Sequence, residues 1–591
     1  MKYGLNIVGL QYLRKLSIFI LVVTSIACSQ EKQNPLKGML ISTKMEIKSD
    51  TRWEDENGII INGDADIKIA ANATLTIASQ VTVVSDKAIF SGKGKVVFET
   101  AAVEHINIDW FGATANDGTA DNTAIQKAID VAVGSPGVSK VYIPAGEYHL
   151  EEPLVAMLSK NDGYTFFNLT VEGHQLPYNN TGKGKGGVSV LKATKELPFL
   201  LGIQGARGVH IDKLVFDGFL NKEFSKKDLI YKNSQDLYKQ ERFTPISAIV
   251  IDPFSDGLPD DKGYSGLSDY YQTNISSSRV KIENCVLQNV PTGIAISPNG
   301  KTNQGDTIAI SFTRFHNMVQ GVVICQAQSR NVVVDNCSFH RMKYAFNSED
   351  YGEQQGVLPE VSRSKIADGV VWLYKANGNI AYGHFNQVYA EGLYGIGYSQ
   401  LNKQPMHFDA CVFKFRPLLK DEKEGVNPIL IKADNASFVG CTFTFGGGKK
   451  NVEPLLMDIK DAVFINCYFD STPINIGENI RTKNKSEFLS KGLRKAKLKT
   501  STWDEANWSE TENVGIEYDS NMERFSINDT GVYEVGDYIF GALKMESEPF
   551  NGERIFTAIG QVVSKKGGKI FFENAYLPKN AHKLLIIRSK R

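Results

Sequence analysis

The sequence lacks an excess of charge of either sign, because its 591 residues contain 66 Lys and Arg against 66 Asp and Glu. Without a global field the chain has no general attraction to nucleic acid or to a membrane surface, so an anionic ligand must be held by local groups. Proline is scarce at 19 residues, whereas Gly, Phe and Tyr number 52, 32 and 23. This composition indicates many tight turns between short, aromatic-rich strands, and therefore an all-β fold.

Several functional spacings are also missing. The seven cysteines form no CxxC pair, which argues against a cysteine-based zinc site. The run Gly446-Gly-Gly-Lys-Lys450 lacks the spacing of a phosphate-binding loop and is interpreted as a turn. The apolar run 16–27 is too short for a membrane-spanning helix. Nucleotide chemistry and a spanning topology are therefore not indicated.

The first 27 residues are expected to be a targeting segment. Basic residues precede the apolar run 16–27, which ends in the tetrapeptide Ser25-Ile26-Ala27-Cys28, as in a secretory signal. The tetrapeptide resembles a bacterial lipobox, which implies that Cys28 is acylated and becomes the first mature residue. Residues 28–48 are then a tether, the membrane is a partner through lipid, and the protein works in the bacterial cell envelope, anchored to the outer membrane. The alternative is an ordinary signal peptide with an incidental cysteine.

A phrase that recurs five times is the main structural signal. It places a cysteine before a short strand, as in Glu-Asn-Cys285-Val-Leu and Asp-Asn-Cys337-Ser-Phe, and it returns at Cys411, Cys441 and Cys467. A second β-prone run follows each phrase. Neither run can bury its apolar face alone, so the units must stack, and periods of about 20 to 50 residues are typical of solenoids. The phrase cysteines are therefore expected to be free and buried in an interior column.

These phrases resemble the coils of right-handed parallel β-helices. Upstream, the segment from Asp109-Trp-Phe-Gly to Ala-Ile129, followed by Val141-Tyr-Ile-Pro-Ala-Gly-Glu-Tyr148, resembles the opening motif of the pectate-lyase-like superfamily. Asp121 is expected to cap a helix with one apolar face, and this helix would cover the open end of the solenoid. The resemblance implies a β-helix over residues 106–480. It leaves the activity open, because the superfamily includes lyases, hydrolases, epimerases and non-catalytic binders.

The expected fold is therefore all-β: a right-handed parallel β-helix with an N-terminal capping helix and a small C-terminal β module. Residues 49–105 contain short β-prone runs and are expected to form preliminary coils. Residues 481–514 are expected to be a basic linker, either a solvated segment or a contact for an acidic glycan. Residues 515–591 contain strand-like runs that indicate an antiparallel β module.

The candidate site is placed where the middle coils depart from the apolar repeat. The segment 345–353 replaces an aliphatic strand end with three carboxylates and a tyrosine. Glu349, Asp350 and Glu353 are candidates for the acid and the base of a glycoside hydrolase, because neighbouring carboxylates raise one another's pKa. Glu349 is the expected acid and Asp350 its expected partner, with Asp252 or Glu353 as alternative partners. The alternative is an acidic loop that borders an insertion. An alignment of the second strand of each coil places Ser348 in one row with Asp252, Ser297 and Cys325, and Glu349 in the next row with Gln326.

Further residues complete the expected site. His384 is a third candidate catalytic group, and Gln326, Arg341 and Tyr351 are expected to bind substrate. Gln326, Glu349 and His384 follow one another at spacings of 23 and 35 residues, which resembles the catalytic stations of the iota-carrageenase family. That family leaves one residue between its two acids, whereas Asp350 follows Glu349 directly. A structural role is the alternative for the histidine.

Asp252 and Asp256 lie in an oxygen-rich loop that is a candidate calcium site, with a plain surface loop as the alternative. Taken with the resemblance, these residues predict a cell-envelope lipoprotein that degrades a polysaccharide partner, above all an acidic or sulfated one, by glycosidic hydrolysis. A lyase that acts by β-elimination and a non-catalytic glycan-binding surface protein are the alternatives. The polygalacturonase signatures are absent from the sequence, which argues against that hydrolase family.

Overall fold

The computed structural model describes residues 38–589 with internal gaps. The gaps are 86, 100–101, 159–165, 178–186, 221–245, 254–275, 299–304, 326–328, 330, 349, 352–353, 356, 368, 371, 377–382, 394, 400–404, 416–428, 446–454, 466–467, 470–473, 477–498, 501–507, 516, 520–523, 529–534, 536–537, 545–553 and 574–582. Cys28 and the rest of residues 1–37, which include the expected targeting segment, lie outside the described residues. Among the described residues, no helix has the length and hydropathy needed to cross a membrane.

The first compact unit comprises the residues up to Glu104 together with Pro136–Val138, and its strands form a small solenoid of three parallel three-stranded sheets. Its strands are β1 (Met39–Ile41), β4 (Ile59–Asn62) and β7 (Val81–Val84); β2 (Lys44–Ile47), β5 (Asp66–Ile69) and β8 (Phe90–Gly92); and β3 (Thr51–Trp53), β6 (Thr74–Ile77) and β9 (Lys95–Phe98). Alternate residues point inward and are buried, as at Ile59 and Ile61. The expected preliminary coils are present, but they begin at Met39 and not at residue 49.

The second unit opens with β10 (Ile106–Asn107), a short 3-10 helix η1 (Ile108–Phe111) and the helix α2 (Asn122–Gly134). The apolar face of α2 is buried, and the helix lies against β10, β11, β13 and β14, the first strands of the β-helix. The expected capping helix is therefore present. Asp121 occupies the N-cap position but makes no side-chain cap. Its carboxylate instead accepts the backbone N–H groups of Thr114 and His149, and so joins the opening loop to the first coil.

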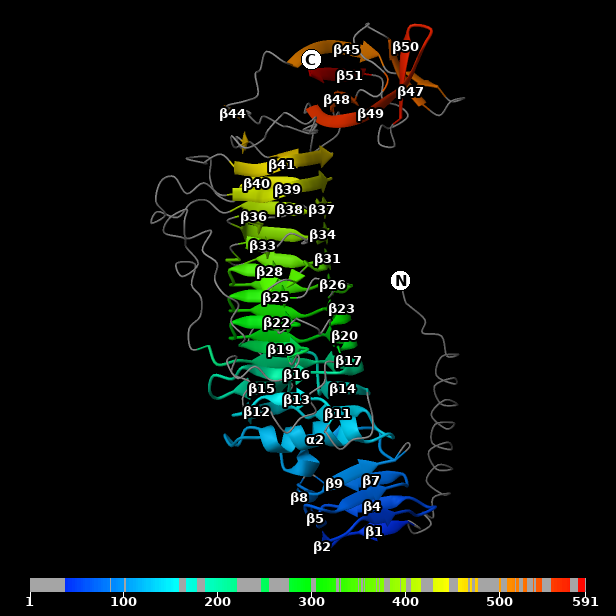
Figure 1. The fold of residues 1–591 in the computed structure, drawn as a ribbon, viewed down its shortest axis with the longest axis vertical. Coiled ribbons are helices and arrows are strands. Elements are labelled where there is room, and N and C mark those ends of the chain that lie inside the picture. The colour runs from blue at the N-terminus through cyan, green and yellow to red at the C-terminus, as the bar shows by residue number, and fades with distance from the viewer. Residues whose placement is uncertain are drawn as a thin grey trace, which may run out of the picture. The chain divides into compact units, whose positions relative to one another are not determined.

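Three parallel ladders of strands form the faces of the β-helix, and each coil contributes one strand to each ladder (Figure 1). Ladder 1 contains β11 (Lys140–Ile143), β14 (Phe167–Gly173), β17 (Ala206–Asp212), β20 (Ser278–Glu283), β23 (Asp306–Ser311), β26 (Val332–Asp335), β31 (Glu360–Ser362), β34 (Gly383–Asn386), β37 (Pro405–Asp409) and the second halves of β39 (Ile429–Val439) and β41 (Leu455–Ile465).

Ladder 2 contains β12 (Gly146–Leu150), β15 (Ser189–Ala193), β18 (Leu214–Asp217), β21 (Val286–Gln288), β24 (Arg314–His316), β27 (Ser338–His340), β32 (Lys365–Ala367), β35 (Tyr389–Leu393), β38 (Val412–Phe415), β40 (Thr442–Phe445) and β42 (Tyr468–Phe469). Ladder 3 contains β13 (Leu154–Ala156), β16 (Phe199–Ile203), β19 (Ser247–Ile251), β22 (Thr292–Ile296), β25 (Gln320–Ile324), β28 (Tyr344–Ser348), β33 (Trp372–Ala376), β36 (Gly395–Ser399), the first halves of β39 and β41, then β43 (Ile474–Ile476) and β44 (Lys499–Thr500). The predicted right-handed parallel β-helix is confirmed.

The interior is filled by stacked aromatic side chains. On ladder 2, the rings of Phe315 and Phe339 lie parallel with centroids 4.6 Å apart. On ladder 1, Phe408 stacks on Phe385 at 5.1 Å and on Phe438 at 4.7 Å. Phe339, Phe408 and Phe438 belong to coils that carry the recurring phrase, and Phe315 and Phe385 fill equivalent positions in coils without the cysteine. The sequence repeat therefore becomes stacked rings in the interior. Such offset stacks add about 0.5–1.5 kcal/mol per pair to the burial of apolar surface.

The phrase cysteines mark the corner between ladder 1 and ladder 2. Before each of the four phrase cysteines that the structure describes, the preceding residue takes a left-handed conformation, as in Asn284 at φ 52° and Asn336 at φ 49°. The next side chain then points inward, and its thiol donates to a backbone carbonyl, as from Cys337 Sγ to Asp335 O at 3.3 Å. Thr313 and Ser364 fill the same corner position in other coils and donate from a hydroxyl. This corner therefore selects a small side chain with a donor.

Four phrase cysteines, Cys285, Cys337, Cys411 and Cys441, are free and buried, as predicted, and Cys467 lies outside the described residues. The C-terminal module is an antiparallel sheet in the order β45 (Trp508–Gly515), β51 (Lys583–Ser589), β48 (Tyr538–Lys544), β49 (Arg554–Lys566), β50 (Lys569–Glu573), β47 (Arg524–Asn528) and β46 (Glu517–Asp519). The predicted antiparallel module is therefore confirmed. Apart from β44 and the start of β45, the expected basic linker lies outside the described residues.

Thiol accessibility tests the corner arrangement. Five of the seven cysteines are buried, so a thiol reagent should label at most two groups rapidly in native buffer. In denaturant, all unmodified thiols should react. Rapid native labelling of Cys285, Cys337, Cys411 or Cys441, located by peptide mass spectrometry, would contradict the inward orientation.

Candidate functional site

Ladder 3 differs from the other faces because its middle strands are buried on both sides. Every residue of β22, β25, β28 and β33 is buried, whereas β20 and β23 of ladder 1 alternate between buried and more exposed positions. The rings of Phe346 and Tyr374 contact other interior rings, including Phe385 at 5.8 Å from each. Because side chains alternate along a strand, the residue after each of these two points to the outer side.

The outer row of ladder 3 changes character along the β-helix. On the N-terminal side, in β19, β22 and β25, it holds Val250, Ala295 and Val323, which belong to one apolar cluster. In the next two coils the same row holds Asn347 and then Lys375, which are 1% and 2% exposed. Burying an amide and an ammonium costs free energy that the aliphatic residues below do not incur. This change is the most pronounced departure from the repeat on ladder 3.

Other polar and aromatic groups surround these two residues. Asn347 Nδ2 donates to Gln320 Oε1 at 2.7 Å, and Gln320 Nε2 donates to Thr292 Oγ1 at 3.0 Å. Lys375 Nζ lies 5.4 Å from the centroid of the Tyr344 ring, within reach of a cation–π contact. Trp372 is the register partner of Tyr344 on the next strand. The row therefore combines amides, a cation and aromatic rings on one face.

The expected site residues divide between different parts of the coil. Glu349 and Gln326 lie outside the described residues, directly after Ser348 at the end of β28 and after Cys325, which follows β25. Asp350 and Tyr351 form β29 (Asp350–Tyr351), which pairs with β30 (Gln354–Gln355), and their side chains are outside the described set. These four candidates share the segments that leave ladder 3.

The expected row of Ser348 with Asp252, Ser297 and Cys325 is wrong by one position. The register pairs Ser348 with Ile324, which in turn pairs with Ile296. Cys325 and Ser297 each come one residue later in their coils. The backbone pairing, and not the similar polarity of the side chains, determines which residues stack.

His384 lies on ladder 1 and not with the ladder 3 candidates. Its Nε2 is 2.6 Å from Asp409 Oδ2, and its Nδ1 is 3.7 Å from Glu360 Oε1. Arg341 lies at the corner between ladders 2 and 3, with φ 53°, one residue after His340. Asn317 occupies the same corner position in the preceding coil. His384 and Arg341 therefore lie at different places on the coil.

Asp252 has a structural role that needs no cation. It follows β19 with φ 57° and is 0% exposed, and its two carboxylate oxygens accept the backbone N–H of Ser277 at 2.8 and 3.0 Å. Ser277 directly precedes β20, so this bond joins the two ends of the segment 253–276. Ser297 repeats the device one coil later by accepting the N–H of Gly305 at 2.9 Å. Asp256, the other expected calcium ligand, is outside the described residues.

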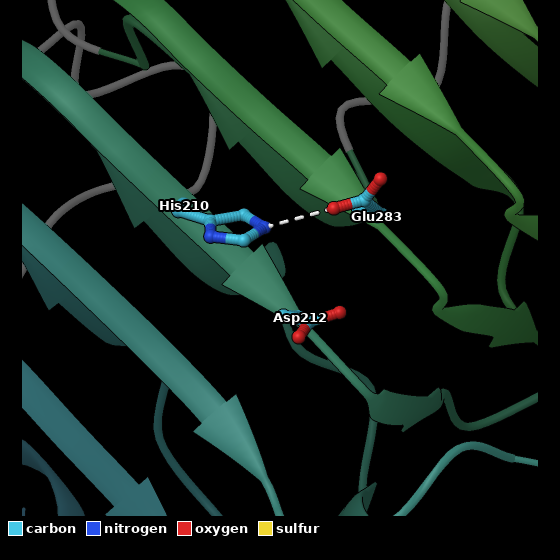
Figure 2. A group of neighbouring side chains, drawn as sticks. All are labelled: His210, Asp212 and Glu283. Atoms are coloured by element: carbon cyan, nitrogen blue, oxygen red, sulfur yellow. Dashed lines mark ion pairs between the residues drawn. The ribbon is translucent and has the colours of Figure 1, made fainter.

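Sequence reasoning missed a polar group on ladder 1, where His210, Asp212 and Glu283 converge (Figure 2). His210 and Asp212 lie on β17 and Glu283 on β20. A segment of 70 residues separates Asp212 from Glu283 in the sequence, so spacing gave no signal. The missed residues of ladder 3, Asn347 and Lys375, did leave a signal. They interrupt the aliphatic strand that follows the phrase in the earlier coils.

Comparison with known proteins agrees with this architecture. Residues 105–370 match the family model described as rhamnogalacturonase A/epimerase, pectate lyase-like. The β-helix is of the pectate-lyase-like type. No curated protein sequence matches the chain. The matched range covers most of the pectate-lyase-like coils, including Asn347, and ends just before Lys375.

Solved structures with some similarity include enzymes that act on carbohydrates. One is the DFA-IIIase from Arthrobacter chlorophenolicus A6, with 10% identity and a TM-score of 0.37 over 63% of this chain and 94% of that chain. Another is the endo-xylogalacturonan hydrolase from Aspergillus tubingensis, with 11% identity and a TM-score of 0.31 over 62% and 88%. A third is the GH87 alpha-1,3-glucanase from Streptomyces thermodiastaticus strain HF3-3, with 12% identity and a TM-score of 0.34 over 64% and 66%.

The buried Asp252 predicts a specific pH dependence. Burial raises the pKa of its carboxyl from the usual range near 4 to about 7, against the opposing effect of the Ser277 donors. A raised folded-state pKa stabilises the fold at low pH, and this contribution is lost as the pH rises through about 7. Asp252→Asn should therefore reduce the loss of stability between pH 5 and pH 8, by on the order of 2 kcal/mol in denaturant titrations.

The matched control is Asp306→Asn, which changes a partly exposed carboxylate at the start of β23. This variant should keep the wild-type pH dependence. Equal changes in the free energy of unfolding of wild type and Asp252→Asn between pH 5 and pH 8 would contradict a raised pKa at Asp252.

Proposed function

We propose that this protein degrades a polysaccharide by hydrolysis of glycosidic bonds, with the outer row of ladder 3 as the floor beneath the site. The observation that carries the proposal is the change of that row from Val250, Ala295 and Val323 to Asn347 and Lys375. The match of residues 105–370 to a family described as rhamnogalacturonase A/epimerase supports a carbohydrate substrate. The two lines of support are independent.

The side chains of this floor suit a sugar polymer. Amide groups such as those of Asn347 and Gln320 both donate to and accept from hydroxyl groups. Aromatic faces such as Tyr344 provide apolar contact for a sugar ring. The ammonium of Lys375 favours a substrate with carboxylate or sulfate substituents over a neutral one. An acidic or sulfated polysaccharide is therefore the proposed substrate class.

Hydrolysis needs two carboxyl groups with different protonation states. A protonated carboxyl donates to the leaving oxygen, and an ionised one activates water or attacks the anomeric carbon. We assign the acid to Glu349, which directly follows the last residue of β28, and its partner to Asp350 in β29. Both belong to the segment that leaves ladder 3 immediately after Asn347 and Ser348. His384 is not included, because it lies on ladder 1 beside Asp409.

Glu349→Gln tests this assignment. The substitution removes the transferable proton at nearly constant shape, so turnover should fall by about 100-fold or more while substrate binding is largely retained. The matched control is Glu360→Gln, which changes an exposed glutamate at the start of β31 and should leave turnover near the wild-type value. Equal turnover of Glu349→Gln and wild type would move the acid elsewhere.

A lyase is the second candidate, and the observation that favours it is Lys375. Beta-elimination begins with removal of a proton next to a carboxylate, and the Lys375 ammonium would neutralise that carboxylate and make the proton easier to remove. Incubation with a panel of carboxylated and sulfated polysaccharides distinguishes the candidates. Hydrolysis yields reducing ends without ultraviolet absorbance, whereas elimination yields unsaturated ends that absorb. Retention on an immobilised polymer without cleavage would favour a glycan-binding protein and contradict both enzymatic proposals.

We also propose that the protein is held at the bacterial outer membrane by lipid on Cys28. The support is the basic and apolar leader followed by Ser25-Ile26-Ala27-Cys28. Cys28→Ala should shift the protein from the membrane fraction to the soluble fraction, as measured by detergent partitioning. Ser29→Ala leaves the thiol intact and should keep the wild-type distribution. Membrane partitioning that survives the loss of Cys28 would show that lipid at this residue is not the anchor.

A further inference from the structure

Three potential metal ligands meet on the outer face of ladder 1, away from the proposed catalytic segment. His210 and Asp212 are two residues apart on β17, so both point to the outer side of the strand. The register pairs Asp212 with Glu283 on the neighbouring strand β20. One ligand atom from each of the three residues lies within 4.8 Å of the others (Figure 2).

The separation of the closest pair fits a small tetrahedral ion. His210 Nε2 is 3.3 Å from Glu283 Oε2. An ion with bonds of about 2.0–2.1 Å to nitrogen and oxygen holds its ligand atoms about 3.3–3.4 Å apart in a tetrahedron. Asp212 needs only a small side-chain adjustment to complete a third bond, because its ligand atom already lies within 4.8 Å.

The state of His210 is the second observation. Its Nε2 atom is buried and makes no hydrogen bond within the described part of the chain, although the ring points at the Glu283 carboxylate (Figure 2). When Nε2 carries no proton, its lone pair repels a carboxylate oxygen at this distance. A cation between the two atoms converts this repulsion into attraction. The geometry therefore favours a cation at this position.

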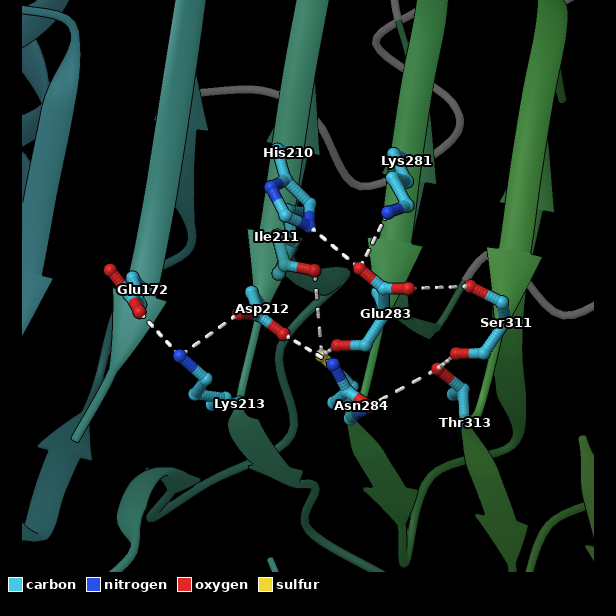
Figure 3. A network of polar contacts seen from close by, with 11 residues as sticks. Glu172, His210, Ile211, Asp212, Lys213, Lys281, Glu283, Asn284, Ser311 and Thr313 are labelled. Atoms are coloured by element: carbon cyan, nitrogen blue, oxygen red, sulfur yellow. Dashed lines mark hydrogen bonds and ion pairs between the residues drawn. The ribbon is translucent and has the colours of Figure 1, made fainter. Parts of the chain in front are cut away.

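In the structure, Lys281 supplies positive charge that neutralises the Glu283 carboxylate in part. Lys281 Nζ lies 2.6 Å from Glu283 Oε2, the same oxygen that faces His210 (Figure 3). The Lys281 ammonium thus occupies a position beside Glu283 Oε2 that a cation could take. The Lys281 side chain is 46% exposed and can turn into solvent without breaking the core. A metal ion would thus replace Lys281 at Glu283.

The remaining contacts hold the other ligands in place. Asn284 Nδ2 donates to Asp212 at 2.8 Å, and Ser311 Oγ donates to Glu283 Oε1 at 3.3 Å (Figure 3). Lys213 Nζ lies 3.3 Å from Asp212 but only 2.5 Å from Glu172, so its ion pair with Glu172 is the stronger of the two. Each carboxylate keeps one supporting bond that orients it, as outer-shell partners do in metal sites.

We propose that His210, Asp212 and Glu283 bind a divalent transition-metal ion of the zinc class in exchange for Lys281. One imidazole nitrogen with two carboxylate oxygens is a ligand set that zinc accepts, whereas calcium prefers six or more oxygen ligands. The site is distinct from the expected calcium loop at Asp252. It does not depend on the proposed polysaccharide activity, because it lies on another ladder.

The test uses the tag-free full chain and cobalt(II), whose absorbance reports tetrahedral binding, with zinc(II) competition to obtain the zinc affinity. Wild type should bind one equivalent, and calcium at millimolar concentration should not displace it. His210→Gln keeps the size of the side chain but removes the imidazole, and it should weaken binding by about tenfold or more. Lys281→Met removes the competing ammonium and should tighten binding by a similar factor.

His407→Ala is the matched control, because His407 also points outward from ladder 1 and its Nδ1 lies 2.7 Å from the hydroxyl of Ser437 and not beside a carboxylate. This variant should bind cobalt as wild type does. Absence of stoichiometric cobalt binding in wild type, equal binding by His210→Gln, or weaker binding by Lys281→Met would overturn the proposal. Circular dichroism of each variant separates loss of the site from loss of the fold, and His210→Ala provides a second substitution if the glutamine variant is misfolded.

Discussion

Backbone hydrogen bonds between successive coils are the constraint on which the rest of this structure depends. They fix the register of each strand on the one below, so residues at equivalent positions stack about 4.8 Å apart for the length of the solenoid. An interior position must then hold side chains that tolerate their own kind as neighbours. Stacked phenylalanines such as Phe385, Phe408 and Phe438 meet this requirement. The corners need a left-handed residue, which explains the asparagines before Cys285 and Cys337.

The same constraint creates an electrostatic problem on the outside. Glu172, Asp212 and Glu283 are register partners on three consecutive strands of ladder 1, so like charges are stacked. Lysines from the corner and from the adjoining row, Lys213 and Lys281, lie between them and offset the repulsion. Lys213 contacts two carboxylates, Glu172 and Asp212, and one ammonium cannot neutralise both. The His210 group is the point on this face where a carboxylate, a second carboxylate and an unbonded ring nitrogen meet, and this is the physical reason that a cation fits there.

Much of the fold could be predicted because repetition is visible in sequence. The recurring phrase around Cys285 and Cys337 required stacking, and the buried cysteines follow from it. The apolar spacing of α2 also identified the capping helix, although not the use of Asp121 to hold Thr114 and His149. That bond joins an opening loop to a strand 28 residues later, and no local pattern specifies it.

The site was harder to predict because its rows depend on register. Matching Ser348 to Ser297 by polarity shifted the alignment by one residue, and one residue along a strand exchanges the inner for the outer face. The group of His210 and Glu283 depends on a pairing across a long insertion, so the sequence carried no spacing to reveal it. The signal at Asn347 and Lys375 was present, but only a correct register shows that they continue the row of Val323.

The two faces tolerate polar groups for different physical reasons. On ladder 1 the charged side chains remain partly solvated, so neighbouring ion pairs cost little and contribute little to stability. On ladder 3, Asn347 and Lys375 are almost completely buried, and each must offset a desolvation cost that Ala295 and Val323 avoid. A solenoid tolerates such a local cost because each coil is stabilised by contacts with the coils before and after it in the stack. The free energy of these contacts offsets the cost of burying the polar side chains. Asn347 and Lys375 lie in a row where burial makes a polar side chain costly to the fold. This cost is the reason to look for their role in function.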